Sequence, residues 1–280
     1  MQTIGIIGAG NIGASLTHNL ILYNKKVVLF DISLDALENA KNKIKEDIRF
    51  SHMYLKKEKN YPASLIELVK FTSDINDLKS CSFIVENVTE DWKIKKDVYQ
   101  QLDKICDNNV ILGANTSCIS ITKLGNITSR PDKVVGMHFM NPVYLKSVVE
   151  VIKGFHTSQE TIDIANDFLE EFGKTSIVVH DFPGFVSNRI SHLFMNEAIF
   201  VLQDSVASAE KIDSIFKKCF GHKMGPLETA DLIGLDTVYN SLLVLYDSYK
   251  DSKYRPAPLL EKMVNAGVLG VKTGEGFYKY

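Results

Sequence analysis

Residues 3–31 read TIGIIGAGNIGASLTHNLILYNKKVVLFD, and this stretch decides the fold. A short apolar run, Ile4–Ile7, leads directly into the glycine motif Gly8-Ala9-Gly10-Asn11-Ile12-Gly13. Apolar side chains then recur at helical spacing, and a second apolar run, Val27–Phe30, ends at Asp31. The order of strand, glycine turn, helix, strand and acidic residue predicts the first βαβ unit of a dinucleotide-binding sheet.

The glycines of this motif suit the close approach of a pyrophosphate. Gly8 permits a tight turn, Gly10 has no Cβ to block the phosphates, and Gly13 lets the helix pack close to the strand. The free N–H groups and partial positive charge at the start of the helix also favour an anion there. We therefore expect a nucleotide to bind along Gly8–Gly13, and a purely structural turn is the alternative.

Asp31 indicates which dinucleotide binds. It lies 18 residues after Gly13, at the end of the second strand, where its carboxylate can accept hydrogen bonds from a ribose diol. The same charge repels a 2′-phosphate, and Ile32 and Ser33 supply no arginine to hold one. Asp31 therefore favours NAD over NADP, and its alternative role is to cap the strand end.

Composition narrows the class of protein. The chain has 280 residues, 45% of them hydrophobic, which suits one large domain or two smaller ones. A net charge of −2 does not suggest a nucleic-acid partner. No apolar run approaches the roughly 20 residues that span a bilayer, and the N-terminus already resembles a core strand. Four scattered cysteines form no zinc spacing, so we expect a cytoplasmic protein with reduced thiols, no bound metal and no membrane partner.

Strand and helix patterns alternate after Asp31. This alternation predicts an α/β domain, a Rossmann-type doubly wound and mostly parallel sheet, over residues 1–183. The expected strands are Val69–Thr72, Ser82–Glu86, Val110–Ala114, Val134–Phe139, Val148–Ile152 and Thr175–Val179, and the expected helices are Leu34–Phe50, Glu90–Ile105 and Ser158–Phe172.

A helical hairpin is expected after the second strand. Pro62 separates Leu34–Phe50 from a second short helix at Ala63–Val69. The connection carries Lys56, Lys57 and Lys59, either as solvated charges or as contacts to an anionic carrier group.

The pattern becomes helical throughout after His180–Phe185. Helices are expected at Val186–Leu202, Ala209–Phe220, Leu227–Tyr249 and Pro258–Ala266. Residues 184–280 are therefore predicted to form a second, all-helical domain.

His138 and Glu150 are the candidate acid–base pair. They lie 12 residues apart, one at the end of a strand and one within the next, and the connection through Asn141-Pro142 is short. An antiparallel return would bring the two side chains together. A histidine held by a carboxylate can act as a general base toward an alcohol and as a general acid toward a ketone. A purely structural His–Glu pair is the alternative.

Seven motifs together resemble the 3-hydroxyacyl-CoA dehydrogenases, most closely the bacterial 3-hydroxybutyryl-CoA dehydrogenases. They extend from the first strand to the C-terminus: Gly8–Gly13, Asn115-Thr116-Ser117, His138-Phe139-Met140-Asn141-Pro142, Val149-Glu150-Val151-Ile152, Pro183–Arg189, Met224-Gly225-Pro226-Leu227-Glu228 and Lys272–Tyr278. The resemblance implies an NAD-dependent oxidoreductase acting on a short hydroxyacyl thioester, and a homodimer formed through the helical domain, which would also bind substrate.

The resemblance also implies roles for individual residues. His138 would be the catalytic acid/base with Glu150 as its orienting partner, and Ser117 and Asn188 would hydrogen-bond the reacting oxygen. Asn141 would lie between nicotinamide and substrate. Beyond the glycine motif and Asp31, the cofactor-contacting positions would be Glu90, Lys95, Ser117, Asn141 and Lys272.

Two departures from the family leave the substrate's carrier open. Lys146 occupies a segment that is usually apolar, so it either reaches solvent or pairs with a carboxylate on the acyl group. In the hairpin, Asp47 and Tyr54 stand near the places where the family contacts the CoA nucleotide. A hydroxymalonyl-type group on an acyl carrier protein, as in polyketide extender-unit biosynthesis, is the second hypothesis. A non-catalytic crystallin-like or cofactor-sensing relative is the third.

Overall fold

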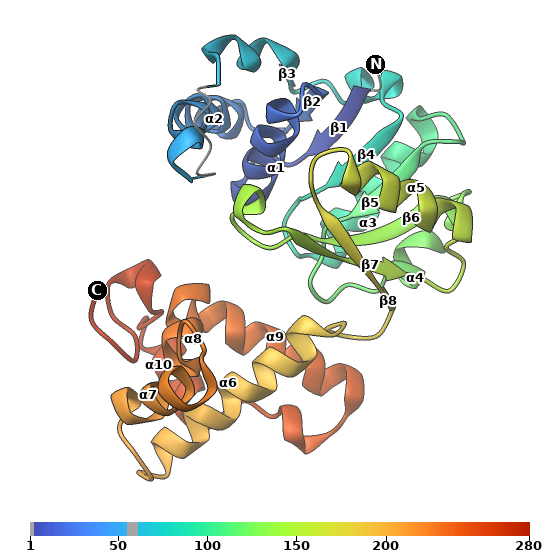
Figure 1. The fold of residues 1–280 in the computed structure, drawn as a ribbon. Helices are drawn as coiled ribbons and strands as arrows, with labels where there is room; N and C mark the ends of the chain where they lie inside the picture. Colours follow the sequence, from blue (N-terminus) through green and yellow to red (C-terminus); the bar gives the residue numbers. More distant parts are fainter. Residues whose placement is uncertain (1–2, 55–60) are drawn as a thin grey trace. The chain divides into compact units, whose positions relative to one another are not determined.

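The computed structural model describes residues 3–54 and 61–280 of the chain. The chain divides into two compact units, the first ending at Asp181 and the second spanning Phe182–Tyr280. Figure 1 shows the sheet-containing first unit and the helical second unit. The hairpin lysines Lys56, Lys57 and Lys59 lie outside the described residues.

The described residues of the first unit form an eight-stranded sheet with strand order β3-β2-β1-β4-β5-β6-β7-β8. Neighbouring strands run parallel except β6 and β7, which are antiparallel. The predicted mostly parallel, doubly wound sheet is thus confirmed. The strands are β1 (Thr3–Ile7), β2 (Lys26–Phe30), β3 (Val69–Thr72), β4 (Phe83–Glu86), β5 (Ile111–Ala114), β6 (Val134–His138), β7 (Val148–Lys153) and β8 (Thr175–His180).

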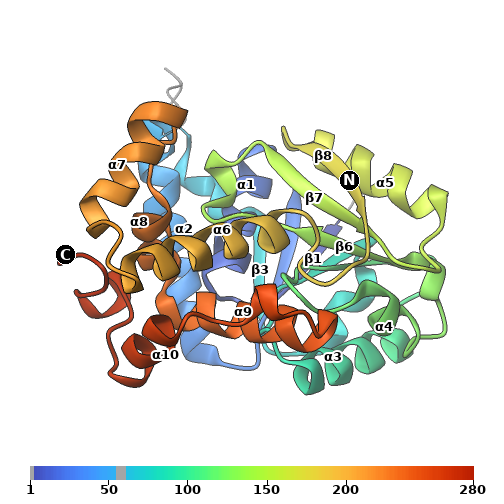
Figure 2. The ribbon, with the colours of Figure 1, turned by 90° about the horizontal axis from the view of Figure 1, so that it is seen from below.

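Helices cover both faces of this sheet. Figure 2 shows α1 and α5 on one face and α3 and α4 on the other. The second short helix of the expected hairpin is a 3₁₀ helix, Ala63–Leu68. The α-helices of this unit are α1 (Asn11–Leu22), α2 (Leu34–Tyr54), α3 (Trp92–Ile105), α4 (Ile121–Gly125) and α5 (Gln159–Glu170).

The order of the strands reverses between β1 and β4. From β1 the chain builds outward through β2 and β3, and from β4 it builds in the opposite direction. A crevice forms at the carboxyl ends of the strands at such a point, and open α/β sheets bind ligands there. The loops after β1 and β4 are in close contact, since a Cβ on Gly8 would lie 2.8 Å from the carbonyl oxygen of Asn87.

The second unit is helical, as expected, and has its own apolar core. Leu227, Leu235 and Leu242 are fully buried in that core. Asp231 is also buried and accepts hydrogen bonds from the backbone N–H groups of Phe277 and Tyr278, which fixes the C-terminal segment. The helices are α6 (Ser187–Gln203), α7 (Ala209–Phe220), α8 (Pro226–Ile233), α9 (Leu235–Tyr249) and α10 (Pro258–Asn265).

The single helix expected over Leu227–Tyr249 is wrong. Gly234 breaks it into α8 and α9 because its backbone adopts φ +100°, which does not continue a helix. The apolar periodicity continues on both sides of this residue, so the pattern alone did not separate the two helices.

A buried histidine, His18, lies on α1. His18 is fully buried, and its Nε2 lies 2.7 Å from the Ser51 hydroxyl, which itself donates to the Asp47 carbonyl. Among the described residues, the Nδ1 of His18 has no hydrogen-bond partner. Burial lowers the pKa of His18 to about 4, although the charge of Asp47 opposes this effect. The histidine is therefore neutral in the folded protein at neutral pH.

Because His18 is neutral in the folded protein, we expect the free energy of unfolding to fall at acidic pH. The unfolded chain binds a proton at this side chain below about pH 6.5, whereas the folded chain does so only near pH 4. The free energy of unfolding should fall by about 2 kcal/mol more in the wild type than in His18→Gln between about pH 7.5 and about pH 5. Urea unfolding followed by the fluorescence of Trp92 measures the difference. An equal pH dependence in the two proteins would contradict this assignment.

Candidate active site

The glycine turn after β1 has the geometry that a dinucleotide needs. Gly8 has φ +90°, and a Cβ on Gly13 would lie 1.8 Å from the Gly8 carbonyl oxygen, so both positions exclude a side chain. A Cβ on Gly10 would meet nothing within 4 Å and would project into open space above the turn. That space, at the N-terminus of α1, fits a pyrophosphate.

Asp31 lies beside this turn. Its Oδ2 accepts a hydrogen bond from the Ala9 N–H at 2.7 Å, and its Oδ1 accepts one from the Ser33 N–H at 2.9 Å. Each carboxylate oxygen can accept a further hydrogen bond, so the carboxylate can cap the strand end and also receive a ribose diol. The two roles considered for Asp31 are therefore compatible.

A cavity of about 640 Å³ adjoins the glycine turn. Gly10, Asn11 and Asn141 line it together, which brings the dinucleotide motif and the predicted nicotinamide-side residue to one space. Its volume lies within the range of about 300–1,000 Å³ that is usual for small-molecule sites. Lys43, Asp47 and Tyr144 also line the cavity.

His138 forms the centre of a second group. The register of β6 and β7 places His138 directly opposite Glu150, and the His138 Nδ1 lies 2.9 Å from the Glu150 Oε2. The Ser117 hydroxyl lies 3.1 Å from the other ring nitrogen, Nε2. His138 and Glu150 are buried and Ser117 is half-buried. A carboxylate at Nδ1 favours the tautomer with its proton on Nδ1, so that the lone pair of Nε2 can accept a proton.

Asn115 connects the strand ends around His138. Its side chain accepts a hydrogen bond from the Phe139 N–H at 3.1 Å and donates one to Asn87 at 2.9 Å. The carboxyl ends of β4, β5 and β6 are thereby joined at the edge of the sheet where ligands are expected.

Lys95, an expected cofactor-contacting residue, lies in the interior of the first unit. Its side chain is fully buried, and its ammonium donates to both Glu86 carboxylate oxygens, at 2.8 and 2.9 Å, and to the Asn115 carbonyl at 2.9 Å. An ammonium has three N–H donors, so these contacts use all of them. Lys95 therefore supports the structure behind the site. Burial raises the pKa of Glu86, and the charge of Lys95 offsets part of that effect.

Glu90 holds the loop that carries Ser117. Its Oε1 accepts from the Ser117 N–H and the Cys118 N–H, each at 2.9 Å, and from the Thr116 hydroxyl at 2.6 Å. The side chain is 40% exposed, so its other oxygen can still meet a ligand.

The turn between β6 and β7 is anchored from two sides. The Val143 N–H donates to the Ser15 hydroxyl on α1, and the buried Lys174 ammonium donates to the carbonyls of Val143 and Lys146. Burial lowers the pKa of Lys174 to about 8. The Lys146 side chain is exposed on this turn and does not line the cavity.

Asn188 and Lys272 belong to the second unit. Asn188 is the second residue of α6 and is partly buried. The Lys272 ammonium lies 2.8 Å from the Asp236 carboxylate and 3.0 Å from the Thr237 hydroxyl.

Both parts of the chain match one family. The model of the 3-hydroxyacyl-CoA dehydrogenase NAD binding domain matches residues 3–182, and that of the 3-hydroxyacyl-CoA dehydrogenase C-terminal domain matches residues 184–280. The chain belongs to the 3-hydroxyacyl-CoA dehydrogenase family. NAD is the cofactor that this family's first domain binds, and the open space above Gly10 accommodates it.

Similar members of the family cover the whole chain. A probable 3-hydroxybutyryl-CoA dehydrogenase of Deinococcus radiodurans is 44% identical over 276 residues, which is 99% of each chain. A probable 3-hydroxybutyryl-CoA dehydrogenase of Bacillus subtilis is 38% identical over 280 residues, which cover 100% of this chain and 98% of the relative. The crystal structure of (S)-3-hydroxybutyryl-CoA dehydrogenase from Ralstonia eutropha matches with TM-score 0.94 and 39% identity, covering 100% of this chain and 99% of that one.

The Glu86–Lys95 pair was not predicted from the sequence. The signal was the spacing of Lys95, Tyr99 and Leu102, which places a lysine on the buried stripe of α3. A lysine on such a stripe needs a buried anion, and Glu86 ends the preceding strand.

None of the helices in residues 3–54 and 61–280 has the length and apolar character of a membrane span. The same residues contain no cluster of His, Cys, Asp or Glu side chains that could hold a metal ion.

Asp31 predicts the choice of cofactor in this dehydrogenase. NADH should bind much more tightly than NADPH, because a 2′-phosphate would face the carboxylate beside the Ala9 N–H. Titration of both cofactors against the fluorescence of Trp92, the single tryptophan, measures the two affinities. Asp31→Asn should narrow the difference, and equal affinities in the wild type would rule out this role.

Proposed function

We propose that this protein interconverts the hydroxyl and keto forms of a short 3-hydroxyacyl-CoA, with 3-hydroxybutyryl-CoA as the substrate. The hydrogen-bonded series Ser117, His138 and Glu150 carries this proposal, because it provides a proton acceptor beside a hydroxyl group and opposite a buried carboxylate. Membership of the family and the full-length relatives support the reaction type and the thioester.

Each member of the series has a separate task. The His138 Nε2 takes the proton of the substrate hydroxyl during oxidation and returns it during reduction. The Glu150 carboxylate holds the Nδ1 proton and stabilises the charged ring. The Ser117 hydroxyl, 3.1 Å from Nε2, hydrogen-bonds the reacting oxygen at the same place. The chemistry that NAD supplies when bound is hydride transfer.

Two residues of the second unit complete the proposal. From the family resemblance, Asn188 is a second hydrogen-bond partner of the reacting oxygen and Lys272 contacts the cofactor. The resemblance also suggests a homodimer formed through the helical unit. Exposed apolar side chains on α6 and α9, among them Ile190, Leu243 and Val244, support such a contact.

CoA is proposed as the carrier in preference to an acyl carrier protein. The relatives that match over their full length carry CoA in their names. NADH oxidation with acetoacetyl-CoA, compared with the same acyl group on a carrier protein, distinguishes the two carriers. Absence of turnover with both would instead favour a non-catalytic relative.

Substitution of His138 tests the acid–base assignment. His138→Gln should lower kcat by roughly 10²–10⁴-fold, the usual contribution of a positioned proton-transfer group, while the affinity for NADH stays close to that of the wild type. Glu150→Gln should also lower kcat and shift the pH–rate profile, because the imidazole loses its anionic partner. Near-wild-type turnover of His138→Gln would refute the assignment.

Lys146 provides a test of substrate choice. Its exposed side chain supports the solvent-facing alternative, so Lys146→Met should change kcat/KM for acetoacetyl-CoA by no more than about twofold. A carboxylated acyl-CoA should respond equally little. A tenfold or larger loss for the carboxylated substrate alone would show that Lys146 pairs with a substrate carboxylate.

A further inference from the structure

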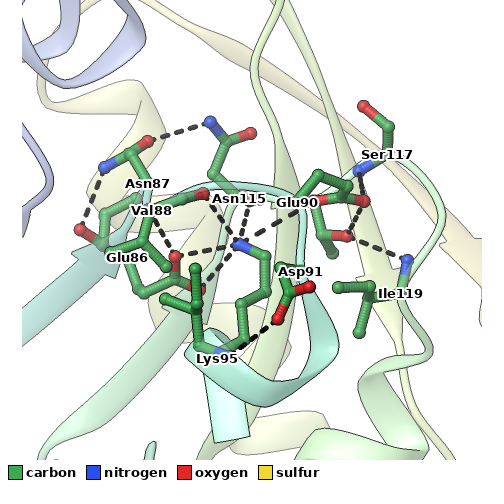
Figure 3. A network of polar contacts seen from close by, with 12 residues as sticks. Glu86, Asn87, Val88, Glu90, Asp91, Lys95, Asn115, Ser117 and Ile119 are labelled. Carbon is green, nitrogen blue, oxygen red and sulfur yellow. Dashed lines mark hydrogen bonds and ion pairs between the residues drawn. The ribbon is translucent and has the colours of Figure 1, made fainter. Parts of the chain in front are cut away.

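One carboxylate oxygen organises the loop after β5. The Glu90 Oε1 accepts three hydrogen bonds from consecutive residues, namely from the Thr116 hydroxyl, the Ser117 N–H and the Cys118 N–H. The Thr116 hydroxyl in turn accepts from the Ile119 N–H at 2.9 Å. Figure 3 shows Glu90 beside Ser117, with Ile119 close by. A single anion thereby fixes the conformation of residues 116–119.

A buried ion pair supports this arrangement from behind. The Lys95 ammonium lies 3.9 Å from the Glu90 Oε2 and is held against Glu86. Glu86 also accepts a hydrogen bond from the Val88 N–H at 2.6 Å, which orders the segment leading to Glu90. Figure 3 shows the Lys95 ammonium between Glu86 and Asn115.

The same network reaches both sides of the acid–base pair. Lys95 donates to the Asn115 carbonyl, and the Asn115 side chain accepts from the Phe139 N–H, next to His138. On the other side, Glu90 accepts a hydrogen bond from the backbone N–H of Ser117, and the hydroxyl of Ser117 lies next to the His138 Nε2. The positions of Ser117 and His138 relative to each other therefore depend on these charged groups.

We propose that Glu90 is a positioning residue whose carboxylate sets the Ser117 hydroxyl against His138, with the Glu86–Lys95 pair as its support. This inference rests on the proposed function of Ser117 and His138. It gives Glu90 a task beyond contact with the cofactor, and it gives Lys95 a task in place of that contact. Three donors at 2.6–2.9 Å around one oxygen call for a full negative charge.

Glu90→Gln is the test variant, since it keeps the shape of the side chain and removes its charge. The neutral amide oxygen is a weaker acceptor for three donors, so the loop should shift. A small misplacement of a reacting group can lower the rate by about 10²-fold, so we expect kcat to fall by about 10- to 100-fold. The loss should be larger in kcat than in the affinity for NADH. Glu170→Gln, on the exposed end of α5, should change each by less than about twofold and serves as the control.

A double-mutant cycle separates positioning from direct contact. If Glu90 acts through the Ser117 hydroxyl, then Glu90→Gln should add less than about a twofold loss once Ser117→Ala is present. A kcat of Glu90→Gln equal to that of the wild type would overturn the proposal. The proposal would also be overturned if Glu90→Gln weakened NADH binding by about tenfold both in the wild type and in Ser117→Ala, because Glu90 would then act only as a cofactor contact.

The rate of alkylation of Cys118 tests the position of the loop without any enzymatic turnover. Cys118 lies in the loop of residues 116–119 whose backbone Glu90 binds. The exposed Cys219 is replaced by serine, so that the only thiols besides Cys118 are the buried Cys81 and Cys106. In that background, Glu90→Gln should speed alkylation of Cys118 by iodoacetamide, because two backbone hydrogen bonds of the loop are weakened. If the wild type reduced no acetoacetyl-CoA, the proposed function would fail while faster alkylation still supported the loop assignment. An unchanged alkylation rate would overturn the positioning proposal whether or not the enzyme turns over.

Discussion

The reversal of chain direction between β6 and β7 is the constraint on which the site depends. A parallel neighbour would require a crossover of a dozen or more residues, usually a helix, between the two strands. The antiparallel return is short, and it places Glu150 directly across from His138. Because side chains alternate along a strand, a slip of one residue in this register would turn Glu150 to the opposite face of the sheet. The short turn and its anchors on Ser15 and Lys174 oppose such a slip.

The ligand-binding edge of the sheet contains buried charged groups. Lys95 and Glu86 form an ion pair away from water, and Lys174 is held by carbonyl oxygens. Removing one member of a buried pair typically costs about 3–5 kcal/mol, because the remaining charge is left without compensation. Such groups restrict the loops around them to few conformations. An apolar core of the same volume would leave the hydrogen-bonding groups of these loops without partners.

Local and repetitive features of the sequence predicted most of the fold. The glycine motif, Asp31 and the alternating strands and helices required only short-range patterns, and the antiparallel pairing of His138 with Glu150 followed from the length of the connection. Features set by distant contacts were harder to predict. Lys95 lies in sequence between Lys93 and Lys96, neither of which is buried, and its role depends on Glu86 at the end of β4 and on the Asn115 carbonyl. Gly234 ends a helix although the apolar spacing continues past it. The hydrogen bonds that Glu90 makes to Thr116, Ser117 and Cys118 join residues that no periodicity connects.

The acid–base pair is contained in one uninterrupted peptide segment of the first unit, from His138 to Glu150. Asn188 and Lys272 are encoded beyond the boundary at Asp181. A recombination event at that boundary would pass the acid–base pair to a descendant intact, while exchanging both of the other proposed contacts at once. The acid–base pair and the two proposed contacts encoded by the helical unit can therefore be inherited separately.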